Sequence, residues 1–344
     1  MTKRKWLLLL LLWGVTAFLI LVASYLTCMT VEIEPYEVRK AKPYIEKIVV
    51  DDAELRQLAS DIVQDYDENE GKVNAIYRYV VKNFTYIADP EDMEFVRSPF
   101  ETLDLKGGDC EDLAILACSL LENIGIRTYL VLTENHAYAL VSGINPDNLR
   151  DHINRSLQEQ FIEDHNMVST IGEEFQLKKG YVCYYGGDGR VFPIEAASFG
   201  DSVVKIESLE IDYSVSTSEL VNIYILPSED EFDNLVQRRS FEHYPDCQKE
   251  EVYQVQATCE ISRYGGIAIQ NPTSRNAMVN LRVTFSYKVY FEGLKVTYYT
   301  LKGEQAIVLE LTAGEYGYPG YSPIAETDEK FAIDPITEEY FYIE

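Results

Sequence analysis

A single cysteine stands where a glycine-rich turn passes into an apolar helix, and this junction constrains the fold more than any other feature. Residues 107–114 read Gly-Gly-Asp-Cys-Glu-Asp-Leu-Ala. Apolar residues then recur at helical spacing up to Leu121, and Gly125 stands where a helix would end. Cys110 is therefore predicted to lie in the first turn of a helix, with its sulfur near the core. The positive end of the helix dipole is expected to favour its thiolate.

Two later segments supply the groups that a cysteine nucleophile needs. His136 stands at the start of a predicted strand, and Glu195 follows the Pro193-Ile194 end of another. His136 is a candidate base, and Glu195 is a candidate to orient its ring. The alternative for each is structural: Cys110 is then a buried core thiol, His136 a strand histidine and Glu195 an exposed carboxylate.

The elements around these residues predict an α+β domain over residues 49–200, with helices packed on an antiparallel sheet. A polar, partly helical insertion over residues 144–178 interrupts the sheet. Insertions of this kind often lie over a cleft, and the sequence leaves open whether this one covers it. The predicted helices span residues 55–66 and 73–84, and the predicted strands span residues 126–132, 136–141, 181–185 and 191–194.

The chain changes character near residue 200. Apolar residues alternate strictly from Val279 to Phe291, which is typical of a half-buried strand. Glycine-containing turns then separate further short strands, including one over residues 306–311. We therefore expect residues 201–344 to form a separate β-rich domain, with the two packed sheets of a β-sandwich.

The N-terminus carries the pattern of a membrane anchor. Basic residues in positions 1–5 precede a run without charge from Trp6 to Leu26, which is long enough to span a bilayer. We expect an uncleaved transmembrane helix over residues 6–28 and a linker over residues 29–48; a removed signal peptide is the alternative. The basic flank predicts a single-pass protein of the cell membrane, with a cytoplasmic N-terminus and its main domains outside.

The overall charge argues against one class of partner. The formal net charge is −27, whereas nucleic-acid binding requires a basic surface. We therefore expect no nucleic-acid partner.

Cys247 and Cys259 are close in the chain and could form a disulfide if the domain is external; free thiols are the alternative.

No cofactor is expected from the sequence. Asp109, Glu111 and Asp112 are expected to cap the helix that follows Cys110, because acidic residues favour helix N-termini. A calcium site built from these three residues is the alternative, although their spacing is not that of an EF-hand.

Residues from about 50 to 200 resemble the transglutaminase-like superfamily, whose members have a papain-like fold. This resemblance implies that Cys110 is a nucleophile and His136 its base, and it places Glu195 where the superfamily usually has an aspartate. Glu195 and Tyr138 depart from the usual residues, which are aspartate and tryptophan. The resemblance lies in residues 74–86, 98–103, 107–114, 120–126 and 136–138.

Three functions are compatible with this sequence. The leading hypothesis is a membrane-anchored, extracytoplasmic cysteine enzyme that forms an acyl-enzyme with a peptide or protein amide, as a protease, an amidase or a transglutaminase. The second is a non-catalytic module that binds a peptide or protein at the cell surface. The third is a purely structural surface protein, and the polar insertion near the expected cleft counts against it.

Overall fold

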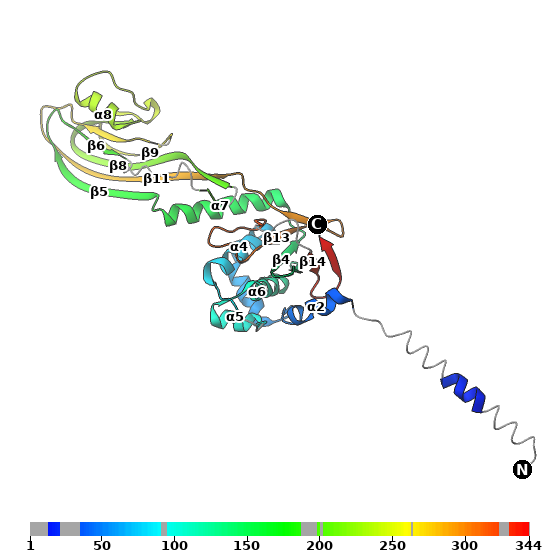
Figure 1. The fold of residues 1–344 in the computed structure, drawn as a ribbon. Coiled ribbons are helices and arrows are strands. Elements are labelled where there is room, and N and C mark those ends of the chain that lie inside the picture. The colour runs from blue at the N-terminus through cyan, green and yellow to red at the C-terminus, as the bar shows by residue number, and fades with distance from the viewer. Residues whose placement is uncertain are drawn as a thin grey trace, which may run out of the picture.

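The computed structural model of the chain has two parts. Figure 1 shows a compact part built from helices and a sheet, and an elongated curved sheet that extends away from it. The structure describes residues 13–20, 35–90, 95–186, 198–199, 202–262, 264–322 and 330–343.

The compact part contains a six-stranded sheet whose neighbouring strands are all antiparallel. A short parallel pair joins β1 (Thr85–Tyr86) to β2 (Gly107–Gly108) beside it. The sheet order is β12 (Tyr298–Leu301), β13 (Glu304–Leu309), β4 (Ala137–Ser142), β3 (Thr128–Leu132), β14 (Lys330–Ile333) and β15 (Tyr340–Ile343). Five helices accompany it, α2 (Tyr36–Ile45), α3 (Ala53–Ile62), α4 (Asn69–Asn83), α5 (Pro99–Leu105) and α6 (Cys110–Asn123).

Helix α6 is the centre of this part and lies against both β3 and β4. Its N-cap is Asp109, whose side chain accepts a hydrogen bond from the N–H of Asp112. Almost every residue of the helix is buried. After its end, Gly125 adopts a φ of +79°, a conformation that favours glycine. The predicted position of Cys110 in the first turn of a helix is therefore confirmed, as is the role of Asp109 as a cap.

The elongated part is a seven-stranded sheet in which β8 pairs with β11, β10, β9 and β7. The predicted alternation from Val279 to Phe291 is confirmed for most of β11, whose odd-numbered residues are largely buried. Helix α7 (Pro146–Asp164) links the two parts, and α8 (Glu229–Val236) lies near the far end. The strands are β5 (Val168–Leu177), β6 (Val182–Gly186), β7 (Ser198–Phe199), β8 (Ser202–Leu226), β9 (Lys249–Ile261), β10 (Gly266–Gln270) and β11 (Ala277–Glu292).

The arrangement of these sheets differs from the predicted division at residue 200. Strands β12–β15 come after the elongated sheet in the chain, yet they complete the same sheet as β3 and β4. The predicted strand over residues 181–185 corresponds to β6, which belongs to the elongated sheet rather than to the core. The predicted strand over residues 191–194 lies outside the described residues.

The β-sandwich expected over residues 201–344 is not what the structure has. The described strands of the elongated part form one curved sheet, and its buried cluster draws side chains from β8, β9, β10 and β11. Tyr244 and Cys247, from the segment between β8 and β9, pack against this cluster. Alternating apolar residues indicate that one face of a strand is buried, but they do not specify what covers that face.

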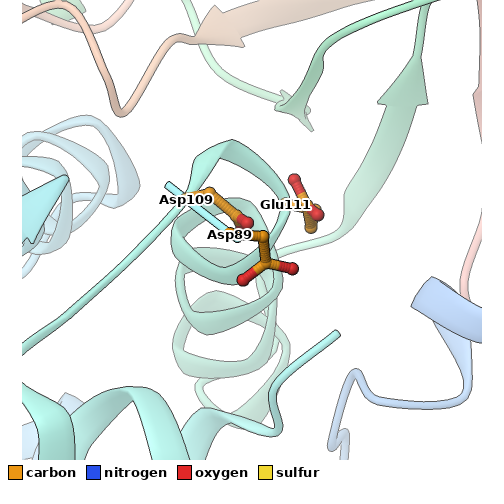
Figure 2. Close-up of side chains that lie close together, drawn as sticks. All are labelled: Asp89, Asp109 and Glu111. Atoms are coloured by element: carbon orange, nitrogen blue, oxygen red, sulfur yellow. The ribbon is translucent and has the colours of Figure 1, made fainter. Parts of the chain in front are cut away.

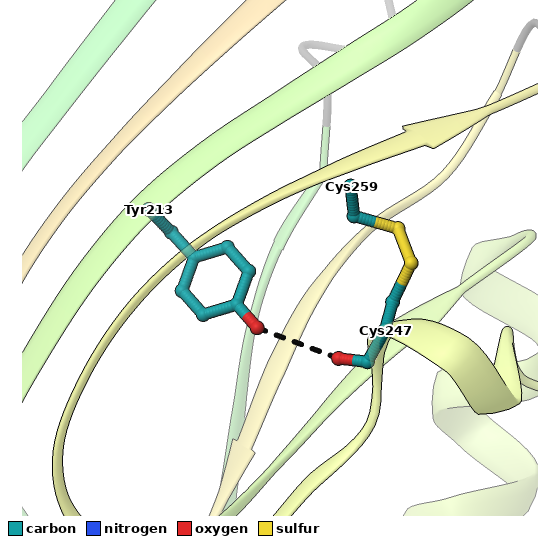
Figure 3. The surroundings of a disulfide bond; sticks show 3 residues. All are labelled: Tyr213, Cys247 and Cys259. Carbon is teal, nitrogen blue, oxygen red and sulfur yellow. Dashed lines mark hydrogen bonds between the residues drawn. A yellow bond between two sulfur atoms is a disulfide. The ribbon is translucent and has the colours of Figure 1, made fainter.

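A disulfide joins Cys247 to Cys259, as the sequence suggested it could (Figure 3). The two Cα atoms are 5.7 Å apart, within the usual range for such a bond. The bond ties the segment before β9 to the end of β9. The hydroxyl of Tyr213 on β8 donates a hydrogen bond to the carbonyl of Cys247 at 3.4 Å.

The predicted transmembrane segment over residues 6–28 falls mostly outside the described residues. Residues 13–20 are helical. In the parts of the chain that the structure describes, no helix combines the length and the apolar character needed to cross a bilayer.

Candidate functional site

A pocket of about 380 Å³ opens beside the N-terminus of α6. Both Cys110 and His136 line it, so the structure brings together two of the three residues that the sequence singled out. No residue of the insertion over residues 144–178 lines this pocket. The other lining residues are Lys40, Tyr44, Tyr86, Asp89, Asp109, Glu111, Leu132, Thr133, Glu134, Asn135 and Ala137.

Two glycines allow the backbone before Cys110 to pack closely enough to place its side chain at the pocket. Gly107 lies in β2, where a Cβ atom would come within 2.5 Å of the carbonyl oxygen of Thr85 on β1. A Cβ atom on Gly108 would come within 2.5 Å of Asp112 Cβ in the first turn of α6. Larger residues would therefore push β2 away from both neighbours, and the cysteine would move with it.

His136 lies in the turn between β3 and β4. The N–H and the hydroxyl of Thr133 both donate to the carbonyl of His136, at 2.9 and 3.1 Å. Lys40 of α2 reaches across to donate to the carbonyl of Thr133 at 3.0 Å. The imidazole ring stacks on Tyr138, with ring centroids 6.2 Å apart. The turn and its neighbours thus fix the position of the histidine ring.

The carboxylate that bonds to His136 is Glu310, which the sequence did not single out. The His136 Nε2 atom donates to Glu310 Oε2 at 2.7 Å, and the Glu310 residue is only 1% exposed. Glu310 directly follows β13, the strand that pairs with β4, so strand pairing brings it beside the histidine. One signal was available: Glu310 is the single charged residue in the predicted strand over residues 306–311.

The predicted third residue, Glu195, lies outside the described residues. Within the described part of the chain, Glu310 is the carboxylate paired with His136. Burial alone would lower the pKa of His136, but the hydrogen bond and charge of Glu310, together with the charge of Glu111, raise it above its ordinary value. Glu310 and Glu111 therefore stabilise the imidazolium that His136 forms when it accepts a proton.

The thiol of Cys110 is in a less favourable setting than the helix dipole suggested. Its Sγ atom donates a hydrogen bond to Glu111 Oε2 at 3.1 Å. Burial, followed by this bond and the charge of Glu111, raises the thiol pKa to about 12, while a bond with the Ala137 backbone acts in the opposite direction. The expectation that the thiolate is favoured is wrong, because it counted the helix dipole and left out both the burial of the sulfur and the carboxylate beside it.

Three carboxylates gather at the N-terminal end of α6, as Figure 2 shows. Oxygen atoms of Asp89, Asp109 and Glu111 lie within 4.8 Å of one another, and these are the residues that could hold a divalent cation. Burial, together with the charges of Glu111 and Asp112, raises the pKa of Asp109 to about 8. A proton on Asp109 therefore relieves part of the repulsion in this cluster.

Asp112 is not a member of this cluster, although the sequence grouped it with Asp109 and Glu111. Its Oδ1 atom accepts the backbone N–H of Arg97 at 2.7 Å, and its Oδ2 atom forms an ion pair with the guanidinium group of the same arginine. The guanidinium also pairs with Asp89 at 3.1 Å. Arg97 therefore ties the segment before α5 to the first turn of α6.

Comparison with known families supports the resemblance seen in the sequence. Residues 56–154 match the family model of the transglutaminase-like superfamily, and this stretch includes both Cys110 and His136. The predicted resemblance is thus confirmed over this part of the chain. Glu310 lies beyond the matched residues. A search of curated proteins found no match to the chain.

Proposed function

We propose that this protein is a membrane-anchored, extracytoplasmic cysteine enzyme that transfers an acyl group from a peptide or protein amide. Cys110 is the nucleophile and His136 is the base. Glu310 takes the orienting role for which Glu195 was the sequence-based candidate. The single observation that carries the proposal is the 2.7 Å bond between His136 and a buried carboxylate, in the same pocket as Cys110.

The chemistry depends on which ring nitrogen of His136 is hydrogen-bonded to Glu310. Glu310 accepts the hydrogen bond that the Nε2–H group donates, which leaves Nδ1 as the nitrogen that can take the thiol proton. The sulfur then bonds to the amide carbonyl carbon, and His136 returns the proton to the leaving amine. Water or a second amine next attacks the thioester carbon, transfers a proton through His136 and releases the thiol. Water gives hydrolysis, and an amine gives transamidation.

The high thiol pKa defines the costly step of this cycle. Very little thiolate forms near neutral pH when the pKa is about 12, so the proton has to leave the sulfur as the carbon–sulfur bond forms. The imidazolium that this transfer creates is stabilised by Glu310 and Glu111, which raise the pKa of His136. This stabilisation offsets part of the cost of ionising the thiol.

The proposed location rests on two features. The uncharged run from Trp6 to Leu26 has the length of a membrane anchor, and a basic flank precedes it. The disulfide between Cys247 and Cys259 supports an external domain, because such bonds persist in oxidising compartments.

The test uses the full-length protein in detergent, an unfolded protein as acyl donor and a fluorescent primary amine as acceptor. New amino termini report hydrolysis, and fluorescence attached to the donor protein reports transamidation. We expect Cys110→Ser to abolish both signals. Cys183→Ser is the matched control, since Cys183 is a partly buried thiol in the elongated sheet. Activity that persists in Cys110→Ser would refute the proposed mechanism.

A peptide-binding module is the second candidate function, and one observation favours it. The thiol of Cys110 is held as a hydrogen-bond donor to Glu111, which suits a structural cysteine better than a nucleophile. On this alternative, the pocket binds a peptide and the Cys110→Ser variant binds it as tightly as the wild type. Equal binding, together with no turnover of either kind, would establish this role.

A further inference from the structure

The two oxygens of the Glu310 carboxylate have different partners. Oε2 accepts from His136 Nε2 at 2.7 Å. Oε1 accepts two hydrogen bonds from Thr312, one from its backbone N–H at 3.0 Å and one from its hydroxyl at 2.5 Å. Three donors therefore surround one buried carboxylate, and two of them come from a residue that lies only two positions further along the chain.

We propose that Thr312 is a positioning residue of the site: it holds the Glu310 carboxylate in the orientation that directs Oε2 at His136. The inference rests on the proposed function, since it concerns the group that orients the base. It assigns a role to a residue that lies well outside the region matched to the superfamily.

A glutamate carboxylate needs such a partner. Rotation about its last side-chain bond is only weakly restricted, so an otherwise free carboxyl group samples a broad range of orientations. Two donors on one oxygen restrict this rotation and leave the other oxygen facing the histidine. Hydrogen bonds to a charged oxygen are also about twice as strong as those between neutral groups.

The backbone of residues 310–312 is held by contacts with the core. The hydroxyl of Tyr77 on α4 donates to the carbonyl oxygen of Glu310 at 2.7 Å. Leu311 is buried in the main apolar cluster, between Glu310 and Thr312. Since Leu311 anchors the chain between them, Thr312 stays within reach of the carboxylate, and its hydroxyl is free to set the orientation.

Among the described residues, Thr312 and His136 donate the hydrogen bonds that the Glu310 carboxylate accepts. Among the described residues, the ion pair of Glu310 is formed with His136 alone. No lysine or arginine of the described chain is paired with this carboxylate. Loss of the Thr312 hydroxyl is therefore expected to weaken both the orientation of Glu310 and its stabilisation of the imidazolium.

The experiment measures alkylation of Cys110 by iodoacetamide across pH in the full-length protein. Thr312→Val keeps the branched shape and the N–H but removes the hydroxyl. We expect the part of the alkylation rate that is lost in His136→Ala to fall about tenfold in Thr312→Val. This is the size of one hydrogen bond to a charged group. The apparent pKa of His136, obtained from the pH dependence of this rate, should also fall. Thr312→Ser should restore both, and Thr300→Val, at an exposed site on β12, should change neither.

A double-mutant cycle separates positioning from a general effect on the fold. In a Glu310→Gln background, Thr312→Val should have no further effect on the rate, because there is no charged carboxylate left to orient. Equal rates for Thr312→Val and the wild type would overturn the inference and leave the Cys110–His136 pair intact. An undiminished effect of Thr312→Val in the Glu310→Gln background would also overturn the inference. Alkylation that is insensitive to His136→Ala would instead refute the proposed function, and the role of Thr312 with it.

Discussion

Glu111 is expected to hold the Cys110 thiol in its protonated form, and Glu111→Gln tests this directly. The Glu111 residue is 6% exposed, and its Oε2 atom lies 3.1 Å from the sulfur. With a pKa of about 12, about three in 100,000 of these thiols are ionised at pH 7.5. With the ordinary value of about 9, the fraction would be about 3%.

The substitution removes a charge but keeps the shape of the side chain. Burial is the largest cause of the raised thiol pKa and remains in the variant, whereas the bond to Glu111 and its charge are the next two causes and disappear. We therefore expect the pKa of Cys110 to fall by about one unit or more. Each unit gives about ten times more thiolate, but the nucleophilicity of that thiolate falls about threefold. The alkylation rate at pH 7.5 should thus rise about threefold for each unit.

The assay follows alkylation from pH 6 to pH 11, with Cys110 identified by peptide mapping. Cys183 is an internal reference, because burial raises its pKa to about 11 without a contribution from Glu111. Glu134→Gln is the matched control, since Glu134 lines the same pocket. An unchanged Cys110 pKa in Glu111→Gln would refute the reasoning. If the pKa does fall, turnover of an amide by Glu111→Gln distinguishes two roles of Glu111. Faster turnover means that Glu111 suppresses the reactivity of the thiol, and slower turnover means that Glu111 accepts the thiol proton.

Three further predictions concern the same structure. Glu310→Gln should lower the pKa of His136 and reduce turnover by about 10²–10⁴; undiminished turnover would remove Glu310 from the site. In metal-free buffer, the free energy of unfolding should fall as pH rises from about 4 to about 8, because native Asp109 keeps a proton that the unfolded chain releases. Asp109→Asn should flatten this dependence in urea titrations, and an unchanged slope would contradict the assignment. Replacing Cys247 and Cys259 with serine should cost about 3 kcal/mol of stability; an unchanged urea midpoint under oxidising conditions would exclude this contribution.

The sequence was sufficient to find Cys110 and His136 because each is marked by local chemistry. A cysteine after Gly-Gly-Asp at the start of an apolar helix has few structural interpretations, and the histidine stands next to an apolar strand. The helices α3, α4 and α6 were also predictable, because their apolar spacing extends over several turns. These features depend on neighbours within a few residues, which a single sequence contains. The expected linker over residues 29–48 is wrong in part: it contains α2, whose Val38, Ala41 and Ile45 are buried in the core.

Glu310 could not be found in this way, because its partner lies 174 residues earlier in the chain. The connection between the two residues is the pairing of β13 with β4, in which Leu309 faces Ala139. Nothing in the local pattern around Glu310 specifies that pairing. A similar limit explains the wrong expectation for the Cys110 thiol, because whether Glu111 turns toward the sulfur or toward solvent depends on the surrounding fold.

The connections between the two parts explain how a core can be completed by strands so far along the chain. The elongated sheet leaves the core at β5 and returns through β11, and these two strands pair with each other from Val168 to Leu177. The N–H of Tyr287 donates to the carbonyl of Met167 at 3.1 Å where the two strands meet the core. The chain therefore re-enters the core beside its point of departure, so the length of the intervening sheet adds little to the cost of bringing β13 to β4. The position of Glu310 then depends on the register of β13 against β4, rather than on the elongated sheet.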